Sequence, residues 1–179
     1  MNKEYVLKVA GLTRRLPICP INDKLDIAAF IMFSDIELTI ACAQELKKKL
    51  PDCDVILTAE SKGIPLAYEL ARQLNVPYVV ARKSVKLYMT NPVSVKVKSI
   101  TTEKIQTLYL SQEDADKVKG KKVIIADDVI STGESLLSLE KLTEAAGGTI
   151  IAKSAVLAEG AAADRTDIIY LEKLPVFFK

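Results

Sequence analysis

The chain contains no histidine and no tryptophan, and its 179 residues include only three cysteines. Without histidine, a Ser-His or Cys-His hydrolase and any histidine acid–base mechanism are excluded. Cys19, Cys42 and Cys53 lack the Cys-x-x-Cys spacing of a zinc site. We interpret them as small apolar side chains in a reducing compartment.

Long apolar runs and a strong net charge are also missing. The apolar runs are far shorter than a bilayer span, and the N-terminus MNKEY lacks the apolar core of a secretory signal. We therefore expect a cytoplasmic protein that does not bind membranes. A net charge of +2 gives little general attraction to nucleic acid. The length and the hydrophobic content of 49% fit one folded domain, which we expect to span residues 1–179.

One stretch of the chain is especially informative: residues 123–135 read VIIADDVISTGES. The four apolar residues 123–126 predict a buried strand, which would end at Asp127 and Asp128. A polar turn with Gly133 follows, and then apolar residues at helical spacing predict a helix. Carboxylates accept hydrogen bonds from sugar hydroxyls, and backbone amides at a helix start bind phosphate together with Ser and Thr hydroxyls. The stretch therefore predicts a site for a phosphorylated sugar.

Other proteins use parts of the same pattern. Ser131 and Glu134 have the spacing of a helix capping box, but a cap does not explain the two acids. In response-regulator receivers the acid pair follows the first strand, whereas here it lies late in the chain. A Walker B strand requires a Gly-x-x-x-x-Gly-Lys-Ser/Thr loop, which this sequence lacks.

The whole stretch resembles the 5-phosphoribosyl-1-pyrophosphate (PRPP) motif of the purine phosphoribosyltransferases. That motif is an apolar strand, Asp-Asp or Glu-Asp, two apolar residues and a Thr-Gly loop. The resemblance implies that Asp127 and Asp128 hold the ribose hydroxyls and take part in catalysis. It also implies that the 5-phosphate lies against the loop residues Val129, Ile130, Ser131, Thr132, Gly133, Glu134 and Ser135.

Strands and helices are predicted to alternate along the rest of the chain. The patterns predict strands at 5–9, 27–33, 54–58, 77–82, 122–126, 149–157 and 167–171, helices at 35–50, 63–74 and 133–146, a loop at 13–26, and hairpin arms at 93–98 and 104–110. This alternation predicts an α/β fold whose mainly parallel, twisted, Rossmann-like sheet is flanked by helices. Ligands of such sheets bind beyond the carboxyl ends of the strands. The resemblance adds a flexible β-hairpin loop and a small N-terminal hood formed by about residues 1–35.

Two further strand ends carry groups suited to a diphosphate. Residues 58–63 read TAESKG between a strand and a helix, and they resemble the pyrophosphate loop of adenine phosphoribosyltransferases, which carries Glu-Ala-Arg-Gly. Lys62 replaces that Arg and loses its bidentate fork. The resemblance implies a catalytic role for Glu60 and diphosphate contacts from Ala59, Ser61, Lys62, Gly63, Arg82, Lys83 and Lys86. The segment 84–106 is expected to close over the diphosphate.

The base is less clearly specified than PRPP. Adenine is the first choice, because residues 60–63 and the stretch Phe33–Ile36 resemble adenine enzymes; xanthine or guanine is second, because residues 30–50 resemble xanthine enzymes. Residues Ser94–Val97 lack the Tyr and the first Glu of the adenine enzymes' loop, which leaves Glu103 as the carboxylate of that segment. The side chains expected to flank the base, each equally compatible with plain core packing, are Phe30, Phe33, Val129 and Ile130.

Residues 58–68, 74–77 and 105–107 also resemble the PRPP-binding effector domain of Gram-positive purine-operon repressors. Those domains are not known for catalysis and follow a winged-helix domain, for which too few residues precede the strand at 54. Glu60 matches the enzymes, so we expect a transferase without direct DNA binding. The resemblance further implies a homodimer, and Mg²⁺ held through PRPP and water without direct protein ligands.

Overall fold

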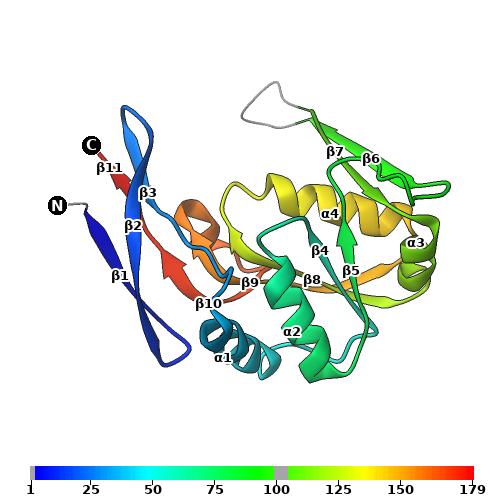
Figure 1. Ribbon diagram of the computed structural model, residues 1–179, viewed down its shortest axis with the longest axis horizontal. Coiled ribbons are helices and arrows are strands. Elements are labelled where there is room, and N and C mark those ends of the chain that lie inside the picture. The colour runs from blue at the N-terminus through cyan, green and yellow to red at the C-terminus, as the bar shows by residue number, and fades with distance from the viewer. Residues whose placement is uncertain (1–2, 99–104) are drawn as a thin grey trace.

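A five-stranded parallel sheet forms the centre of the molecule in the computed structural model, which describes residues 3–98 and 105–179 (Figure 1). The strand order is β10-β9-β8-β4-β5, and every neighbouring pair is parallel. The strands are β4 (Val55–Ala59), β5 (Tyr78–Ala81), β8 (Lys122–Ile130), β9 (Thr149–Glu159) and β10 (Ile169–Leu174). The predicted α/β fold with a mainly parallel sheet is thereby confirmed.

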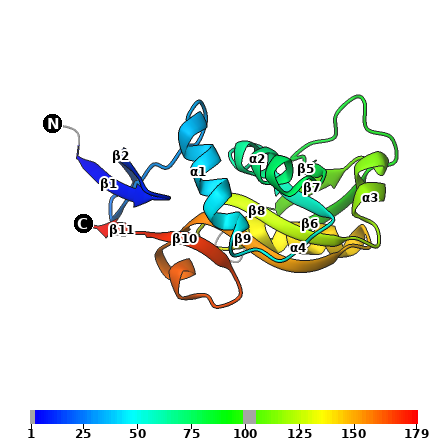
Figure 2. The same ribbon diagram turned by 90° about the horizontal axis from the view of Figure 1, so that it is seen from below.

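Helices cover both faces of this sheet (Figure 2). Helices α1 (Ile36–Lys47) and α2 (Ile64–Leu74) pack on one face, and α4 (Glu134–Ala145) packs on the other together with α3 (Gln112–Val118). On β4, Ile56 belongs to the first core cluster, whereas Val55 and Leu57 belong to the second. Successive side chains of a strand point to opposite faces, so a sheet buried on both faces requires such continuous apolar runs.

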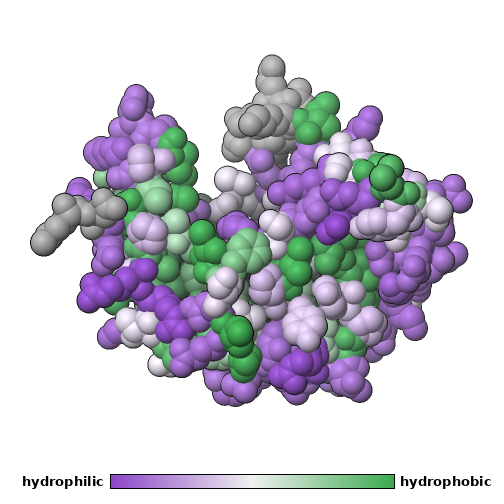
Figure 3. All heavy atoms as spheres, viewed as in Figure 1, coloured by the Kyte–Doolittle hydropathy of each residue, from purple (hydrophilic) through white to green (hydrophobic). Residues whose placement is uncertain are grey.

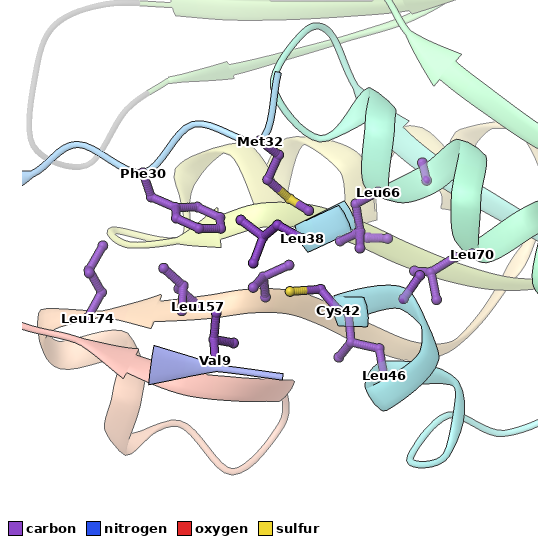
Figure 4. Close-up of a cluster of buried hydrophobic side chains, with 14 of the residues drawn as sticks. Val9, Phe30, Met32, Leu38, Cys42, Leu46, Leu66, Leu70, Leu157 and Leu174 are labelled. Carbon is purple, nitrogen blue, oxygen red and sulfur yellow. The ribbon is translucent and has the colours of Figure 1, made fainter. Parts of the chain in front are cut away.

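Helix α1 begins at a side-chain cap and buries one face. Asp35 caps α1, because its side chain accepts a hydrogen bond from the Leu38 amide at 3.1 Å. Leu38, Cys42, Ala43 and Leu46 are buried, whereas Ile36 is 74% exposed. Figure 4 shows the cluster that Leu38 and Cys42 form with α2 and β9.

A second, antiparallel sheet lies at one end of the molecule (Figure 1). Its order is β1 (Glu4–Val9), β2 (Leu12–Asn22), β3 (Leu25–Ala28) and β11 (Val176–Phe178). We call these four strands the small sheet. The hood was expected from residues 1–35 alone, but the C-terminal β11 pairs with β3 and completes the sheet. Both ends of the chain thus build one structure.

Two sequence predictions in this region were wrong. The expected loop at 13–26 is mostly strand, because its prolines lie where the ladder permits them: Pro17 pairs with Glu4 at the start of β1, and Pro20 borders a register shift. The expected strand at 27–33 ends at Ala28, and residues 29–33 leave the sheet. We had weighted the prolines as breakers and the apolar run as a strand.

The predicted hairpin is confirmed as β6 (Val93–Lys98) and β7 (Ile105–Leu110), paired antiparallel from Val93–Leu110 to Lys98–Ile105. Reciprocal backbone hydrogen bonds of 2.9 Å between Arg82 and Tyr109 connect β7 to the end of β5. Glu103 and Lys104 lie outside the described residues. Helix α3, β11 and the 3₁₀ helix η1 (Gly160–Asp164) were not predicted. Among the described helices, none has the length and apolar character needed to span a membrane.

Candidate active site

A cleft of about 680 Å³ separates the small sheet from the carboxyl ends of the central strands. Because all five central strands are parallel, their carboxyl ends and the loops that follow them share this edge. The space-filling view in Figure 3 shows the surface hollowed between the small sheet and the body of the molecule. The predicted strand-end loops therefore do meet at one site.

Asp127 and Asp128 lie within β8 rather than after it, because β8 continues its pairing with β9 as far as Ile130. Asp128 is 2% exposed, and its Oδ2 lies 2.9 Å from Lys62 Nζ. The Asp128 amide donates to Asp127 Oδ1 at 2.9 Å. Burial, reinforced by the negative charge of Asp128, raises the pKa of Asp127 well above its usual range. The free pair therefore holds a proton to higher pH than an exposed aspartate does.

The loop from Ser131 to Gly133 leads into α4 and borders a second cavity of about 40 Å³ next to Asp127. Gly133 is the N-cap of α4 and has φ of 80°. This backbone conformation favours glycine. Ser131 is thus not the cap of a capping box. The start of a helix points its backbone amides outward, and such a position suits an anion.

The loop after β4 carries Glu60, which reaches the end of β5. Its Oε1 accepts a hydrogen bond from the Lys83 amide at 2.6 Å, and its Oε2 lies 3.4 Å from Arg82 Nη1. Lys86 Nζ is 3.8 Å from Oε1. The peptide bond between Glu60 and Ser61 is cis. One carboxylate therefore gathers three residues of the basic segment at the edge of the cleft.

Gly63 packs directly against the acid pair. A Cβ at this position would lie 2.7 Å from Asp127 Oδ1, 3.2 Å from Asp127 Cα and 2.5 Å from Thr58 Oγ1. The hydroxyl of Thr58 is buried and has no hydrogen-bond partner in the described part of the chain. The close approach leaves no room for a side chain, so it fixes the loop after β4 against the end of β8.

The structure brings most of the predicted site residues together. Those that line the main cleft are Phe30, Ala59, Glu60, Ser61, Lys62, Lys83, Asp127, Asp128, Val129, Ser131 and Ser135. Ile130, Thr132 and Gly133 line the smaller cavity, and Glu134 borders a neighbouring one with Arg165. Three predicted residues lie outside these linings. Gly63 packs against Asp127, and Arg82 and Lys86 lie beside the Glu60 carboxylate.

The two predicted aromatic residues occupy different environments. Phe30 is 4% exposed and points into the core cluster while it also borders the cleft (Figure 4). Phe33 is 47% exposed and lies outside the cleft lining. Phe30 and Val129 are therefore the predicted base-flanking residues that the cleft retains, and Phe33 is not.

Sequence reasoning missed several residues of the cleft. They are Ile21, Ile27, Ala28, Ala29, Ile31, Glu159 and Leu174. The strand-end rule could have found Glu159, since it is the last residue of β9. The others depend on how the small sheet packs. Across the described ranges, no group of three or more His, Cys, Asp or Glu side chains could hold a metal ion.

Comparison with known proteins adds to this geometry. Residues 37–173 match the family model for the phosphoribosyl transferase domain. The chain is 36% identical over 114 residues to a hypoxanthine/guanine phosphoribosyltransferase of Methanothrix thermoacetophila, which covers 64% of this chain and 56% of that protein. It is also 36% identical over 93 residues to the purine biosynthesis transcriptional repressor PurR of Bacillus subtilis, with coverage of 52% and 32%. The chain thus spans about half or less of the length of these two relatives.

Solved structures share the fold. The adenine phosphoribosyltransferase of Thermoanaerobacter pseudethanolicus superposes with a TM-score of 0.67 and 25% identity, over 79% of this chain and 84% of that one. The APRTase of Giardia lamblia gives a TM-score of 0.65 over 95% of this chain and 93% of that one, at 19% identity. The latter likeness concerns the fold alone.

Proposed function

Because the chain belongs to the phosphoribosyl transferase domain family, we propose that it transfers the 5-phosphoribosyl group of PRPP to a purine base and releases pyrophosphate. One observation carries the proposal: an acid pair, with Asp128 buried and Asp127 partly buried, lies between two loops suited to anions in a single cleft. The bond from the anomeric carbon to the diphosphate breaks, and a bond from that carbon to a purine nitrogen forms. The product is a nucleoside monophosphate.

Each wall of the cleft has a distinct role in this reaction. Asp127 and Asp128 bind the 2- and 3-hydroxyls of ribose, and the amides at the start of α4 bind the 5-phosphate. Lys62 and Lys83 stabilise the diphosphate as it leaves, and Arg82 and Lys86 are held beside it by Glu60. The reacting carbon becomes cationic in the transition state, so positioning and electrostatics provide the catalysis without a protein nucleophile.

Mg²⁺ is part of the same proposal. The surroundings of Asp128 fit a nearby cation: its Oδ2 is buried, lies 2.9 Å from the Lys62 ammonium group and accepts no aligned hydrogen bond from the residues that the structure describes. Mg²⁺ retains much of its water shell, so Asp127 and Asp128 would hold it through water rather than as direct ligands. When bound, it neutralises charge on the diphosphate. The two aspartates orient the sugar independently of that contribution.

Two groups of related enzymes support different choices of base. The resemblance of residues 60–63 to adenine enzymes and the solved adenine enzyme at 25% identity support adenine. The curated relatives include hypoxanthine/guanine enzymes and, at 32% identity over 70% of this chain, a xanthine phosphoribosyltransferase of Exiguobacterium. The proposal therefore covers purines as a class.

A homodimer is also proposed. Ile36 and Tyr68 are exposed by 74% and 53%, and both line an apolar groove between α1 and α2. Exposed apolar grooves of this kind are common at protein interfaces. Light scattering after size exclusion measures the oligomeric state directly. A monomer at micromolar concentration would contradict this part of the proposal.

A non-catalytic PRPP sensor is the second candidate function, favoured by the similarity to the PurR repressor and by the altered stretch Ser94–Val97. The two functions share the PRPP site and differ in turnover. Pyrophosphate release is measured with PRPP, Mg²⁺ and, in separate reactions, adenine, guanine, hypoxanthine or xanthine. Turnover with a base establishes the transferase. PRPP binding without turnover would support the sensor, and absence of PRPP binding would contradict both.

Asp128→Asn provides the matched control for this assay. The substitution keeps the shape of the side chain and removes the charge that faces Lys62 and the ribose hydroxyls. We expect turnover to fall ~100-fold or more, since electrostatic groups of this kind contribute most to such reactions. Unchanged kinetics in the variant would contradict the assigned role of the acid pair.

A further inference from the structure

Glu159 is a carboxylate of the cleft to which neither the motifs nor the reaction above assign a role. It ends β9, beside Leu174 of β10, and it borders the main cleft. Asp127 pairs with Ala155 of β9, so Glu159 lies four residues further along that strand. At ~3.3 Å per residue this is about 13 Å along the strand. Glu159 and the acid pair thus lie on neighbouring strands and line the same cleft.

Glu159 shares the cleft with both apolar and charged residues. Leu174 is its pairing partner on β10, and Ile27, Ala28 and Phe30 line the same cleft. Within residues 3–98 and 105–179, the Glu159 carboxylate makes no hydrogen bond and no salt bridge. Burial raises its pKa, and the charge of Lys62 opposes that effect. A half-buried carboxylate in such a cleft is costly unless a donor group satisfies it.

From this placement we propose that Glu159 selects the base, because its carboxylate accepts hydrogen bonds from N–H groups on the edge of the purine. The inference rests on the proposed transferase function and adds the substrate class: a purine with an exocyclic amino group. Guanine presents its N1–H and 2-amino N–H side by side, which suits both carboxylate oxygens. Adenine presents one amino group. Xanthine presents a carbonyl at carbon 2, which a carboxylate repels.

Two pairs of bases test this selection, because the members of each pair exchange an amino group for a carbonyl, together with the protonation of one adjacent ring nitrogen. Guanine and xanthine differ at carbon 2, and adenine and hypoxanthine differ at carbon 6. We expect the wild-type protein to prefer the amino member of at least one pair by about 10- to 100-fold in kcat/KM, the range of a hydrogen bond to a charged group. Glu159→Gln should reduce that preference at least ~10-fold, because an amide both donates and accepts. The KM for PRPP should stay unchanged.

Glu172→Gln is the matched control, since it places the same substitution at an exposed position of the neighbouring strand β10. It should retain the wild-type preference in both pairs. Glu159→Asp keeps the charge, shortens the side chain and should give an intermediate preference. If Glu159→Gln leaves the preferences in both pairs within about twofold of wild type, or if wild type prefers the carbonyl members, the inference is wrong.

Nucleotide binding tests Glu159 without turnover. Calorimetry with GMP, XMP, AMP and IMP compares the same groups in the products. If nucleotides bind but PRPP is not turned over, the transferase proposal fails, and the selectivity still supports or contradicts the role of Glu159. If turnover occurs and Glu159→Gln changes no preference, the transferase proposal stands and the role of Glu159 is overturned. Absence of any nucleotide binding would overturn both.

Discussion

The two walls of the cleft are built in different ways. The acidic wall, residues 59–62 and 127–135, consists of continuous segments at the ends of parallel strands, and the buried Asp128 lies at its centre. The apolar wall, residues 27–31 and Leu174, depends on the small sheet, to which both ends of the chain contribute. The acidic wall is thus determined locally, by short motifs. The apolar wall depends on pairing between strands that are far apart in the sequence, so substitutions there can alter base selection without altering the PRPP motifs.

The largest effect should come from a side chain placed where the acidic wall has no space. In Gly63→Ala, the new Cβ would meet Thr58 Oγ1 at 2.5 Å and Asp127 Oδ1 at 2.7 Å, so the loop after β4 must move away from β8. We expect PRPP affinity to fall ~100-fold and stability to fall by about 1–3 kcal/mol, as overpacking typically costs. Calorimetric titration and denaturant unfolding measure the two effects.

Gly120→Ala separates the loss of binding from the loss of stability. A Cβ at Gly120 meets nothing within 4 Å, but φ of +70° makes alanine unfavourable by ~1 kcal/mol. This variant should therefore lose stability and retain PRPP affinity. If Gly63→Ala bound PRPP as tightly as Gly120→Ala, the close packing at Gly63 would not be needed for the site.

The next effect concerns Glu60, to which the resemblance assigned a catalytic role. Its carboxylate accepts the Lys83 amide and lies within 4 Å of Arg82 and Lys86, which indicates that it positions the basic segment. In Glu60→Ala we expect the KM for PRPP to rise ~10-fold, the value of one charged hydrogen bond, with little change in kcat. Steady-state kinetics distinguishes the two roles, because a catalytic Glu60 would lower kcat instead. Glu60→Gln keeps an acceptor and should be milder.

A smaller effect is expected on the apolar wall. Phe177 of β11 contacts Tyr5 of β1 edge to face, with ring centroids 5.9 Å apart, and its substitution by alanine removes a contact that joins the two ends of the chain. Because Phe177 is only partly buried, we expect a loss of about 1–2 kcal/mol, less than for a core Phe. The KM for the base should rise severalfold, while the KM for PRPP stays within about twofold. Phe178→Ala is the control, because Phe178 is 80% exposed. Equal changes in both KM values would show that the two walls are not independent.

The same contrast explains which parts of the structure could be predicted from sequence. The central strands and the acid pair follow from local patterns: branched apolar runs for the strands, and Asp127–Gly133 for the loop that follows. The extension of β8 through Asp127 and Asp128 was missed, because two carboxylates are unfavourable within a strand and only the pairing with β9 stabilises them there.

The small sheet could not be predicted in the same way. Strand β11 has three residues, too few for a periodic signal, and its partner β3 lies about 150 residues away in the sequence. Pro17 and Pro20 indicated a loop until the observed register showed that neither interrupts a regular ladder. The cleft residues from this region, such as Ile27 and Leu174, were missed for the same reason. Local motifs predicted the acidic wall, whereas the apolar wall required three-dimensional information.

The smallest effect concerns stability and the acidic wall alone. The raised pKa of Asp127 means that the folded state holds a proton that the unfolded chain releases near pH 4. Stability relative to the unfolded state is therefore fully present below about pH 4 and decreases as the pH rises toward the folded-state pKa. Asp127→Asn has no carboxyl to titrate, so it should gain stability over wild type as the pH increases from about 4 to 7.

The gain of Asp127→Asn at neutral pH should be at least about 1 kcal/mol, or ~2–4 °C in melting temperature for a chain of this size. Thermal melts of both proteins at several pH values, without PRPP or Mg²⁺, measure this difference directly. A constant difference across the pH range would show that Asp127 is ionised in the free protein. A difference that grows with pH would show that an ionised Asp127 destabilises the free protein. We expect ribose hydroxyls and a cation to offset this cost on binding. The apolar wall, residues 27–31 and Leu174, has no carboxylate that could contribute in this way.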